Sequence, residues 1–270
     1  MGTAWSIFAQ SFWRARAIYG QFWLMVLVAG VFGGMAGVLG VLSRTAGMLA
    51  MPFIVGLVGV LLGTLLMGGI YWTGRAAILN QPRKSVWSEG FRLWGRVWGL
   101  VLALFVWFIA VMVVGIVLSL PFSIGAAMQS MSAATALGMS PFAALGAMIP
   151  VVIVFVVLYV AAIPFMWALE GAIFMADLPV LVAIGPAFRT AYSRKGFWQY
   201  LGYAFLFAVV AALVEIILMA VPVLGVILAL LVEPVLLWAS VVLTLALWLS
   251  VNPGGPSAFG PTVMSAGPAV

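Results

Sequence analysis

Six apolar stretches, each long enough for a membrane-crossing helix, follow one another along this chain of 270 residues. A helix needs about 20 apolar residues to cross the hydrocarbon core of a bilayer. The stretches cover residues 22–42, 48–72, 97–120, 142–167, 198–219 and 225–250. The last two are almost continuous, and we divide them at AVPVLG (220–225), where Pro222 and Gly225 favour a hairpin turn. The sequence therefore predicts an all-α, polytopic membrane bundle of six transmembrane helices within residues 1–250.

The composition supports this prediction, because charged residues are too few to cover a water-soluble domain. They make up 6% of the chain, whereas hydrophobic residues make up 67% and the mean hydropathy is +1.32. A soluble domain carries about 25% charged residues. Residues 251–270 are rich in glycine, proline and alanine and carry no charge, which predicts a flexible tail.

The basic residues gather on one side of the predicted membrane. Ten of the eleven precede the first, third or fifth span, and only Arg44 lies in a segment on the opposite side. By the positive-inside rule, we expect the N-terminus, both basic loops and the C-terminal tail in the cytoplasm. The first span is too long for a cleavable signal and has no small-residue cleavage site after it, so we expect an uncleaved anchor.

The chain has no cysteine and no histidine, which excludes several kinds of chemistry. Thiolate metal sites, the commonest metal ligand and the usual general base are all missing. The sequence also contains no phosphate-binding loop, dinucleotide fingerprint or nucleophile elbow. We therefore expect no enzymatic activity, no metal site and no cofactor. The net charge of +6 follows from the cytoplasmic basic residues and does not indicate a nucleic-acid partner.

A segment rich in aromatic and basic residues precedes each pair of spans, and we call these three segments the lead-in segments. They read WSIFAQSFWRARAIYGQFW (5–23), VWSEGFRLWGRVW (86–98) and IGPAFRTAYSRKGFW (184–198). Each ends in a tryptophan and is followed by two spans. This layout predicts three parallel repeats, each consisting of an interfacial helix and a transmembrane pair.

The spacing of the aromatic residues in the lead-in segments predicts amphipathic helices lying in the membrane interface. In the middle segment one face holds Trp87, Phe91, Trp94 and Trp98, and the opposite face holds Glu89, Arg92 and Arg96. In the third segment Leu181, Ile184, Phe188 and Tyr192 share a face, followed by Trp198; the first segment offers Trp5 and Phe12. Two alternatives are that these residues are ordinary juxtamembrane anchors, or that they pack against the bundle or a partner protein.

Two lead-in segments carry an F-R-x-x-[WY] pattern. The pattern reads Phe91-Arg92-Leu93-Trp94 in the middle segment and, with one extra spacer, Phe188-Arg189-Thr190-Ala191-Tyr192 in the third. In this layout the chain resembles bacterial six-span membrane families, such as the membrane domain attached to some glycerophosphodiester phosphodiesterases. The resemblance implies a multipass protein of the bacterial cytoplasmic (inner) membrane. The sequence contains no soluble phosphodiesterase domain, so we do not expect that family's catalytic activity.

Two acidic residues, Glu215 and Glu233, lie inside predicted spans. Ionisable residues there are costly and are functional candidates by default. A hairpin turn near residue 222 would bring both to a similar depth, where two carboxylates can share a proton or bind a cation. The alternative is that each lies near the outer headgroups, either protonated or bonded to the backbone. We expect Glu170 and Asp177, which flank GAIFMA, to form salt bridges with the basic segments.

Glycine pairs with GxxxG spacing occur in the first two spans. The pairs are Gly30 and Gly34, Gly33 and Gly37, and Gly59 and Gly63. Such pairs allow two helix backbones to approach closely, either within the chain or against a partner.

Taken together, the sequence predicts a non-enzymatic accessory, scaffold or assembly subunit, for example of an energy-converting membrane complex. Its expected partners are membrane lipids and other membrane protein subunits. The alternative function is a transporter of a small solute or lipid that uses Glu215 and Glu233.

Overall fold

The structure is a computed structural model, and it describes residues 2–14, 50–79, 86–134, 141–220 and 222–253. All regular secondary structure in these ranges is helical, which confirms the predicted all-α class. The helices are α1 (Gly2–Arg14), α3 (Ala50–Leu79), α4 (Val86–Ala134), α5 (Pro141–Phe174), α6 (Val180–Ala191), α7 (Arg194–Met219) and α8 (Pro222–Val251).

Three described segments are long and apolar enough to cross a membrane: Ser88–Gly125, Ile149–Phe174 and Arg194–Leu218. A shorter apolar segment, Val235–Val251, belongs to α8. The predicted first span and most of the predicted tail lie outside the described residues. The chain thus has the apolar helices of a multipass membrane protein, while the count of six spans and the threefold repeat stay predictions.

The start and end of α7 have local causes in the sequence. Ser193 caps the helix, since its hydroxyl oxygen accepts a 3.0 Å hydrogen bond from the Gly196 amide. The helix ends at Met219, and α8 begins at Pro222, a residue that suits the first helical position because it lacks an amide hydrogen. A break between two helices is therefore confirmed near the predicted turn, but it lies between Met219 and Pro222, and Gly225 belongs to α8 instead of the turn.

One hydrophobic core joins the helices at one end of the molecule. Its fully buried side chains include Ile70 from α3, Leu169 and Ile173 from α5, Tyr200 from α7, and Trp248 from α8. Helix α1 packs against α8 and α3 at this end, and the Lys195 ammonium donates a 3.1 Å hydrogen bond to the Ser250 carbonyl there. The N-terminal helix α1, the last turns of α3, the first turns of α4, helix α6 and the end of α8 therefore share one end of the fold.

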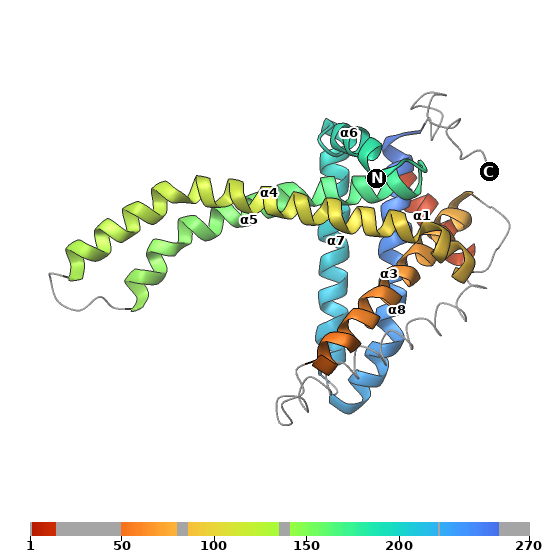
Figure 1. Cartoon of the computed structure of the whole chain (residues 1–270), viewed down its shortest axis with the longest axis horizontal. Helices are drawn as coiled ribbons and strands as arrows, with labels where there is room; N and C mark the ends of the chain where they lie inside the picture. The colour runs from red at the N-terminus through yellow and green to blue at the C-terminus, as the bar shows by residue number, and fades with distance from the viewer. Residues whose placement is uncertain (1, 15–49, 80–85, 135–140, 221, 254–270) are drawn as a thin grey trace.

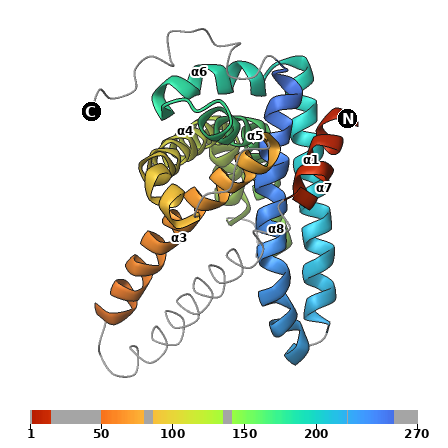
Figure 2. The same cartoon turned by 90° about the vertical axis from the view of Figure 1, so that its right-hand side faces the viewer.

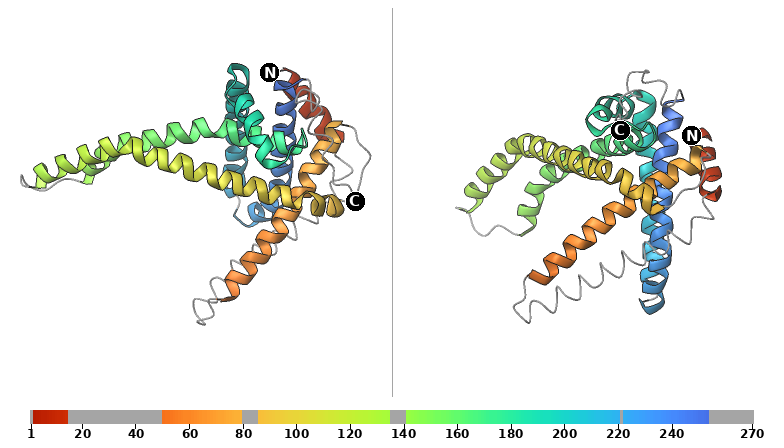
Figure 3. Two further views of the ribbon diagram at one scale, coloured as in Figure 1. Left: turned by 45° about the horizontal axis from the view of Figure 1, so that its top comes forward. Right: turned by 45° about the vertical axis from the view of Figure 1, so that its right-hand side comes forward.

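Away from this core, the apolar helices diverge. The α4–α5 hairpin extends at a large angle to the α7–α8 hairpin (Figure 1), and α3 runs away from α8 (Figure 2). Figure 3 shows the same divergence from two further directions. This arrangement differs from the single bundle of transmembrane helices that the sequence predicts. The physical reason is that lipid is as apolar as the side chains, so no hydrophobic force drives one hairpin against another.

The middle lead-in segment is not a separate interfacial helix, which corrects the prediction. It forms the first turns of α4, which continues without a break from Val86 to Ala134. Leu93, Val97 and Leu100 are buried on one face of these turns. Because this buried face carries straight on into the apolar span, nothing in the sequence stops the helix. The first and third segments do begin with the short helices α1 and α6.

Candidate functional site

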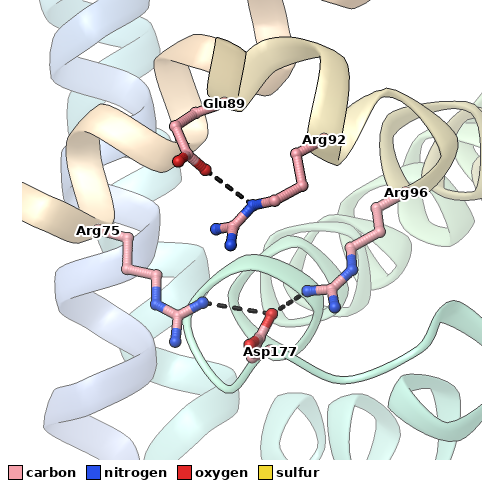
Figure 4. Close-up of polar contacts among 5 residues, drawn as sticks. All are labelled: Arg75, Glu89, Arg92, Arg96 and Asp177. Atoms are coloured by element: carbon pink, nitrogen blue, oxygen red, sulfur yellow. Dashed lines mark hydrogen bonds and ion pairs between the residues drawn. The ribbon is translucent and has the colours of Figure 1, made fainter. Parts of the chain in front are cut away.

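Five charged side chains meet where α3 ends, α4 begins and α5 turns into α6; we call them the charged cluster. Its members are Arg75, Glu89, Arg92, Arg96 and Asp177, and Figure 4 shows them converging. Asp177 lies in the turn with a φ of 61°, in the left-handed region that aspartate tolerates better than most residues. Its Oδ1 atom contacts Nη1 of Arg75 at 3.3 Å and also accepts from Nη1 of Arg96. The predicted pairing of Asp177 with basic segments is confirmed.

The second carboxylate of the cluster is Glu89, whose Oε2 atom lies 2.8 Å from Nε of Arg92. The sequence predicted Glu89 on the water-facing side, but its side chain is only 6% exposed, whereas that of Arg92 is 61% exposed. The cause is a close approach of α3 and α4 at the next residue. A Cβ atom on Gly90 would lie 2.7 Å from the Leu65 carbonyl oxygen, so this face of α4 is pressed against α3.

Glu170 has a different environment from the one the sequence predicts. It accepts a hydrogen bond from the Tyr71 hydroxyl, and in the described part of the chain it forms no ion pair. The Tyr71 ring stacks on Phe174, one turn further along α5. Glu170 therefore lies beside the aromatic core, where tyrosines rather than basic side chains reach it. Sequence reasoning missed Tyr71, although a tyrosine at the end of an apolar span is a signal for such a contact.

The aromatic stripe of the middle lead-in segment is divided between α3 and the surface. Trp94 is half-buried, and its Nε1 atom donates a 2.9 Å hydrogen bond to Oγ1 of Thr64 in α3. Trp98 is also half-buried, whereas Phe91 is exposed. The side chain of Trp87 lies outside the described residues. Part of the stripe thus packs within the chain, in agreement with the alternative that these residues pack against the helix bundle.

Helix α6 exposes the apolar face that the sequence predicts. Leu181, Ile184, Phe188 and Tyr192 are exposed, and we call them the α6 surface. The side that faces the core carries small residues, Ala183, Ala187, Thr190 and Ala191. The large apolar side chains of this amphipathic helix therefore point away from the protein's own core.

Aromatic contacts continue the α6 surface toward the neighbouring helices. The Phe188 ring contacts Phe165 and Tyr192, with ring centroids 6.2 Å and 4.7 Å away. The Tyr192 hydroxyl donates a 3.0 Å hydrogen bond to the Ala161 carbonyl, and partial burial raises the pKa of this hydroxyl above its ordinary value. Trp198, at the start of α7, is exposed.

The first lead-in segment presents fewer aromatic side chains to the outside. Trp5 is exposed, but Phe8 and Phe12 pack against the core, and the three rings follow one another at 5.2 Å and 5.7 Å. Phe12 is therefore part of the intramolecular packing of α1 against the core, whereas Trp5 remains free for contact with lipid or a partner.

The helices that carry Glu215 and Glu233 pack against each other, but the two positions differ in depth. Glu215 precedes the end of α7 by four residues, while Glu233 follows the start of α8 by eleven. A difference of seven residues is about 10 Å along a helix axis. The sequence predicted similar depths, and the position of the turn contradicts this. The side chains of both glutamates lie outside the described residues, so the acidic pair as a functional site stays a prediction.

Of the predicted glycine contacts, only one position can be assessed. Gly30, Gly33, Gly34 and Gly37 lie outside the described residues, as does the local environment of Gly59. A Cβ atom on Gly63 would have no neighbour within 4 Å, so Gly63 does not mediate close packing within the described chain. The close approach of α3 and α4 occurs at Gly68 instead, where a Cβ atom would lie 2.9 Å from the Gly90 carbonyl oxygen.

The fold and these surfaces define a class, an all-helical protein with membrane-length apolar helices and an aromatic, basic end. In comparisons with known proteins, no protein family, no curated protein and no solved structure matches the chain. Within the described ranges, no three acidic side chains come together in a way that suits a metal ion.

Proposed function

We propose that the chain is a non-enzymatic accessory, scaffold or assembly subunit of the bacterial cytoplasmic membrane, with both termini in the cytoplasm. In this proposal it packs against partner helices and lipids, as a subunit of an energy-converting complex would. The observation that carries the proposal is the apolar surface on the outer side of the α4–α5 hairpin.

One side of α4 packs closely against α5. A Cβ atom on Gly115 would lie 2.5 Å from the Phe155 ring, so the two helices approach closely at this point. The opposite side of α4 forms a row of exposed apolar residues, which we call the outer α4 stripe. It contains Leu102, Val106, Ile109, Val113 and Val117. This row follows helical spacing. Other exposed apolar residues, such as Phe105, Phe108 and Met112, lie outside it, so α4 offers apolar side chains around most of its circumference to neighbouring helices or lipid.

Two serine side chains in the outer half of α4 form hydrogen bonds within the same helix. The Ser119 hydroxyl donates to the Ile116 carbonyl at 2.9 Å, and the Ser123 hydroxyl donates to the Ser119 carbonyl at 3.0 Å. Neither hydroxyl offers its proton to a passing solute. This supports a packing function over a hydrophilic pathway along this hairpin.

Site-specific photocrosslinking in the native membrane tests the proposal. A photoreactive residue at Val106 or Val113 is expected to give a discrete adduct with a second protein. The control is the same residue at Val111, which is half-buried and should react within the chain or weakly. Adducts with lipid alone at both exposed positions would argue against a partner on the outer α4 stripe.

A further inference from the structure

The charged cluster has more hydrogen-bond donors than its carboxylates use. Arg75, Arg92 and Arg96 each carry five N–H donors. The ion pairs engage Nη1 of Arg75, Nε of Arg92 and Nη1 of Arg96. The Nε atom of Arg75 is buried and has no hydrogen-bond partner in the described part of the chain. Buried donors are normally satisfied, so a donor of this kind points to an acceptor that the described residues do not supply.

The carboxylates hold the three guanidinium groups together. Arg75 and Arg96 contact the same oxygen atom of Asp177, which places two like charges side by side, and Glu89 holds Arg92 beside them (Figure 4). Three positive and two negative charges leave the cluster with an unbalanced positive charge. A group of planar guanidinium forks with spare donors matches the geometry of a phosphate.

The cluster lies at the depth where the apolar stretches end. Arg75 follows the apolar stretch of α3, and Arg96 lies near the start of the segment Ser88–Gly125, directly before its uncharged part. Lipid phosphates lie at this level of a bilayer, just outside the hydrocarbon core. The side-chain exposures of 61% for Arg92 and 33% for Arg96 leave the cluster accessible from outside.

An apolar surface begins directly beside the cluster. A Cβ atom on Gly99 would lie 2.6 Å from Cγ2 of Val180, so the start of α6 rests on α4 three residues after Arg96. Next to this contact, Val101 and Leu102 of α4 and Leu181 of α6 are exposed. A lipid would place its phosphate at the arginines and its acyl chains along these side chains, whereas a free phosphate would make no use of them.

We propose that Arg75, Arg92 and Arg96 bind the phosphate of an anionic phospholipid headgroup, with Asp177 and Glu89 positioning the guanidinium groups. The net positive charge of the cluster favours a lipid with net negative charge over a zwitterionic one. This site does not depend on the chain having a partner subunit. The lipid site and the proposed function can therefore fail independently.

Lipid binding to the purified full-length chain tests this site. The chain in nonionic detergent is titrated with phosphatidylglycerol or with phosphatidylcholine of the same acyl chains, and retained lipid is counted by native mass spectrometry. We expect phosphatidylglycerol to be preferred, and Arg92→Gln to weaken its binding about fivefold. The matched control is Arg194→Gln, which removes an exposed arginine outside the cluster and should leave the preference unchanged.

Each other outcome overturns the proposal. Equal retention by Arg92→Gln and Arg194→Gln would show that the cluster is not the site, and equal retention of both lipids would remove the anionic selectivity. A third arm adds inorganic phosphate, and displacement of the lipid by millimolar phosphate would assign the site to a free anion. If Arg92→Gln does not fold, Arg92→Lys keeps a positive partner for Glu89. It should bind phosphatidylglycerol about twofold more weakly than Arg194→Lys, because lysine lacks the planar fork, and equal binding overturns the site.

Discussion

The ring of Tyr71 in α3 stacks on the ring of Phe174 in α5, with centroids 3.9 Å apart and planes inclined by 4°. The Tyr71 hydroxyl at the same time donates a hydrogen bond to Glu170, one turn earlier in α5. A single side chain thus joins α3 to α5 by both an apolar and a polar contact. Tyr200 is buried in the same core, but its hydroxyl has no hydrogen-bond partner among the described residues.

Removal of the hydroxyl group should have different effects on the stability of the protein at these two tyrosines. Tyr71→Phe keeps the stacked ring but leaves Glu170 without its donor, which should lower the free energy of unfolding by about 1–2 kcal/mol. Tyr200→Phe removes a buried hydroxyl that gains no bond from the described chain, so stability should stay constant or rise. Thermal unfolding of both variants in the same detergent checks this. A loss for Tyr200→Phe as large as that for Tyr71→Phe would show that the Tyr200 hydroxyl has a partner after all.

Asp177 stabilises the turn in two ways: its carboxylate pairs with two arginines, and its backbone adopts a positive φ. Two substitutions separate these two contributions. Asparagine tolerates a positive φ, so Asp177→Asn removes only the charge that holds Arg75 and Arg96, at a cost of about 1 kcal/mol for a half-exposed network. Asp177→Ala also places an alanine at a φ of 61°, which adds about 1 kcal/mol. Denaturant titration should therefore rank the parent above Asn and Asn above Ala. Equal stability of the two variants would mean that the backbone relaxes at this turn.

Gly171 lies where α5 and α8 touch. A Cβ atom there would be 2.6 Å from Cβ of Trp248, whose side chain is fully buried and cannot move aside easily. Gly171→Ala should destabilise the protein by about 1–3 kcal/mol through overpacking. Gly95→Ala is the matched control, because its Cβ would meet no atom within 4 Å, and alanine is the better helix former by about 1 kcal/mol. Similar melting temperatures for the two variants would contradict the close approach of α5 and α8.

The chain has no cysteine, so single cysteines can carry a spin label at any chosen position. In lipid vesicles, labels at Leu181 and Ile184 should be reached more readily by oxygen, which concentrates in the hydrocarbon region. A label at Arg189, on the neighbouring part of α6, should be reached more readily by a water-soluble nickel complex. Preferential access of the nickel complex to all three labels would show that the α6 surface does not contact lipid.

The features that follow from local pattern were predictable from the sequence. Long apolar runs predicted the helices, Pro222 predicted the turn between α7 and α8, and spacing predicted the exposed face of α6. A lead-in segment that simply continues into α4 was not predictable, because an amphipathic period does not say where a helix stops. The burial of Glu89 was also missed, since it depends on a contact between two helices at Gly90.

The candidate site depends still more on tertiary structure. The sequence indicated that Asp177 pairs with basic residues, but not that Arg75 and Arg96 share one of its oxygen atoms. Those two arginines lie on different helices, and the close packing of α3 on α4 together with the turn at Asp177 brings them together. The depth of Glu233 relative to Glu215 was misjudged because the exact end of α7 decides it. Helix ends are the least certain features that can be inferred from a sequence.

If the chain is a membrane subunit that binds a partner, the mass of the native particle must exceed that of the chain alone. The full chain, purified from its own membrane in a mild detergent, is measured by mass photometry together with mass spectrometry of its components. We expect a particle that contains at least one other protein and exceeds the 28.6 kDa of the single chain after correction for detergent. A particle that always contains one copy of this chain and no other protein would contradict the account.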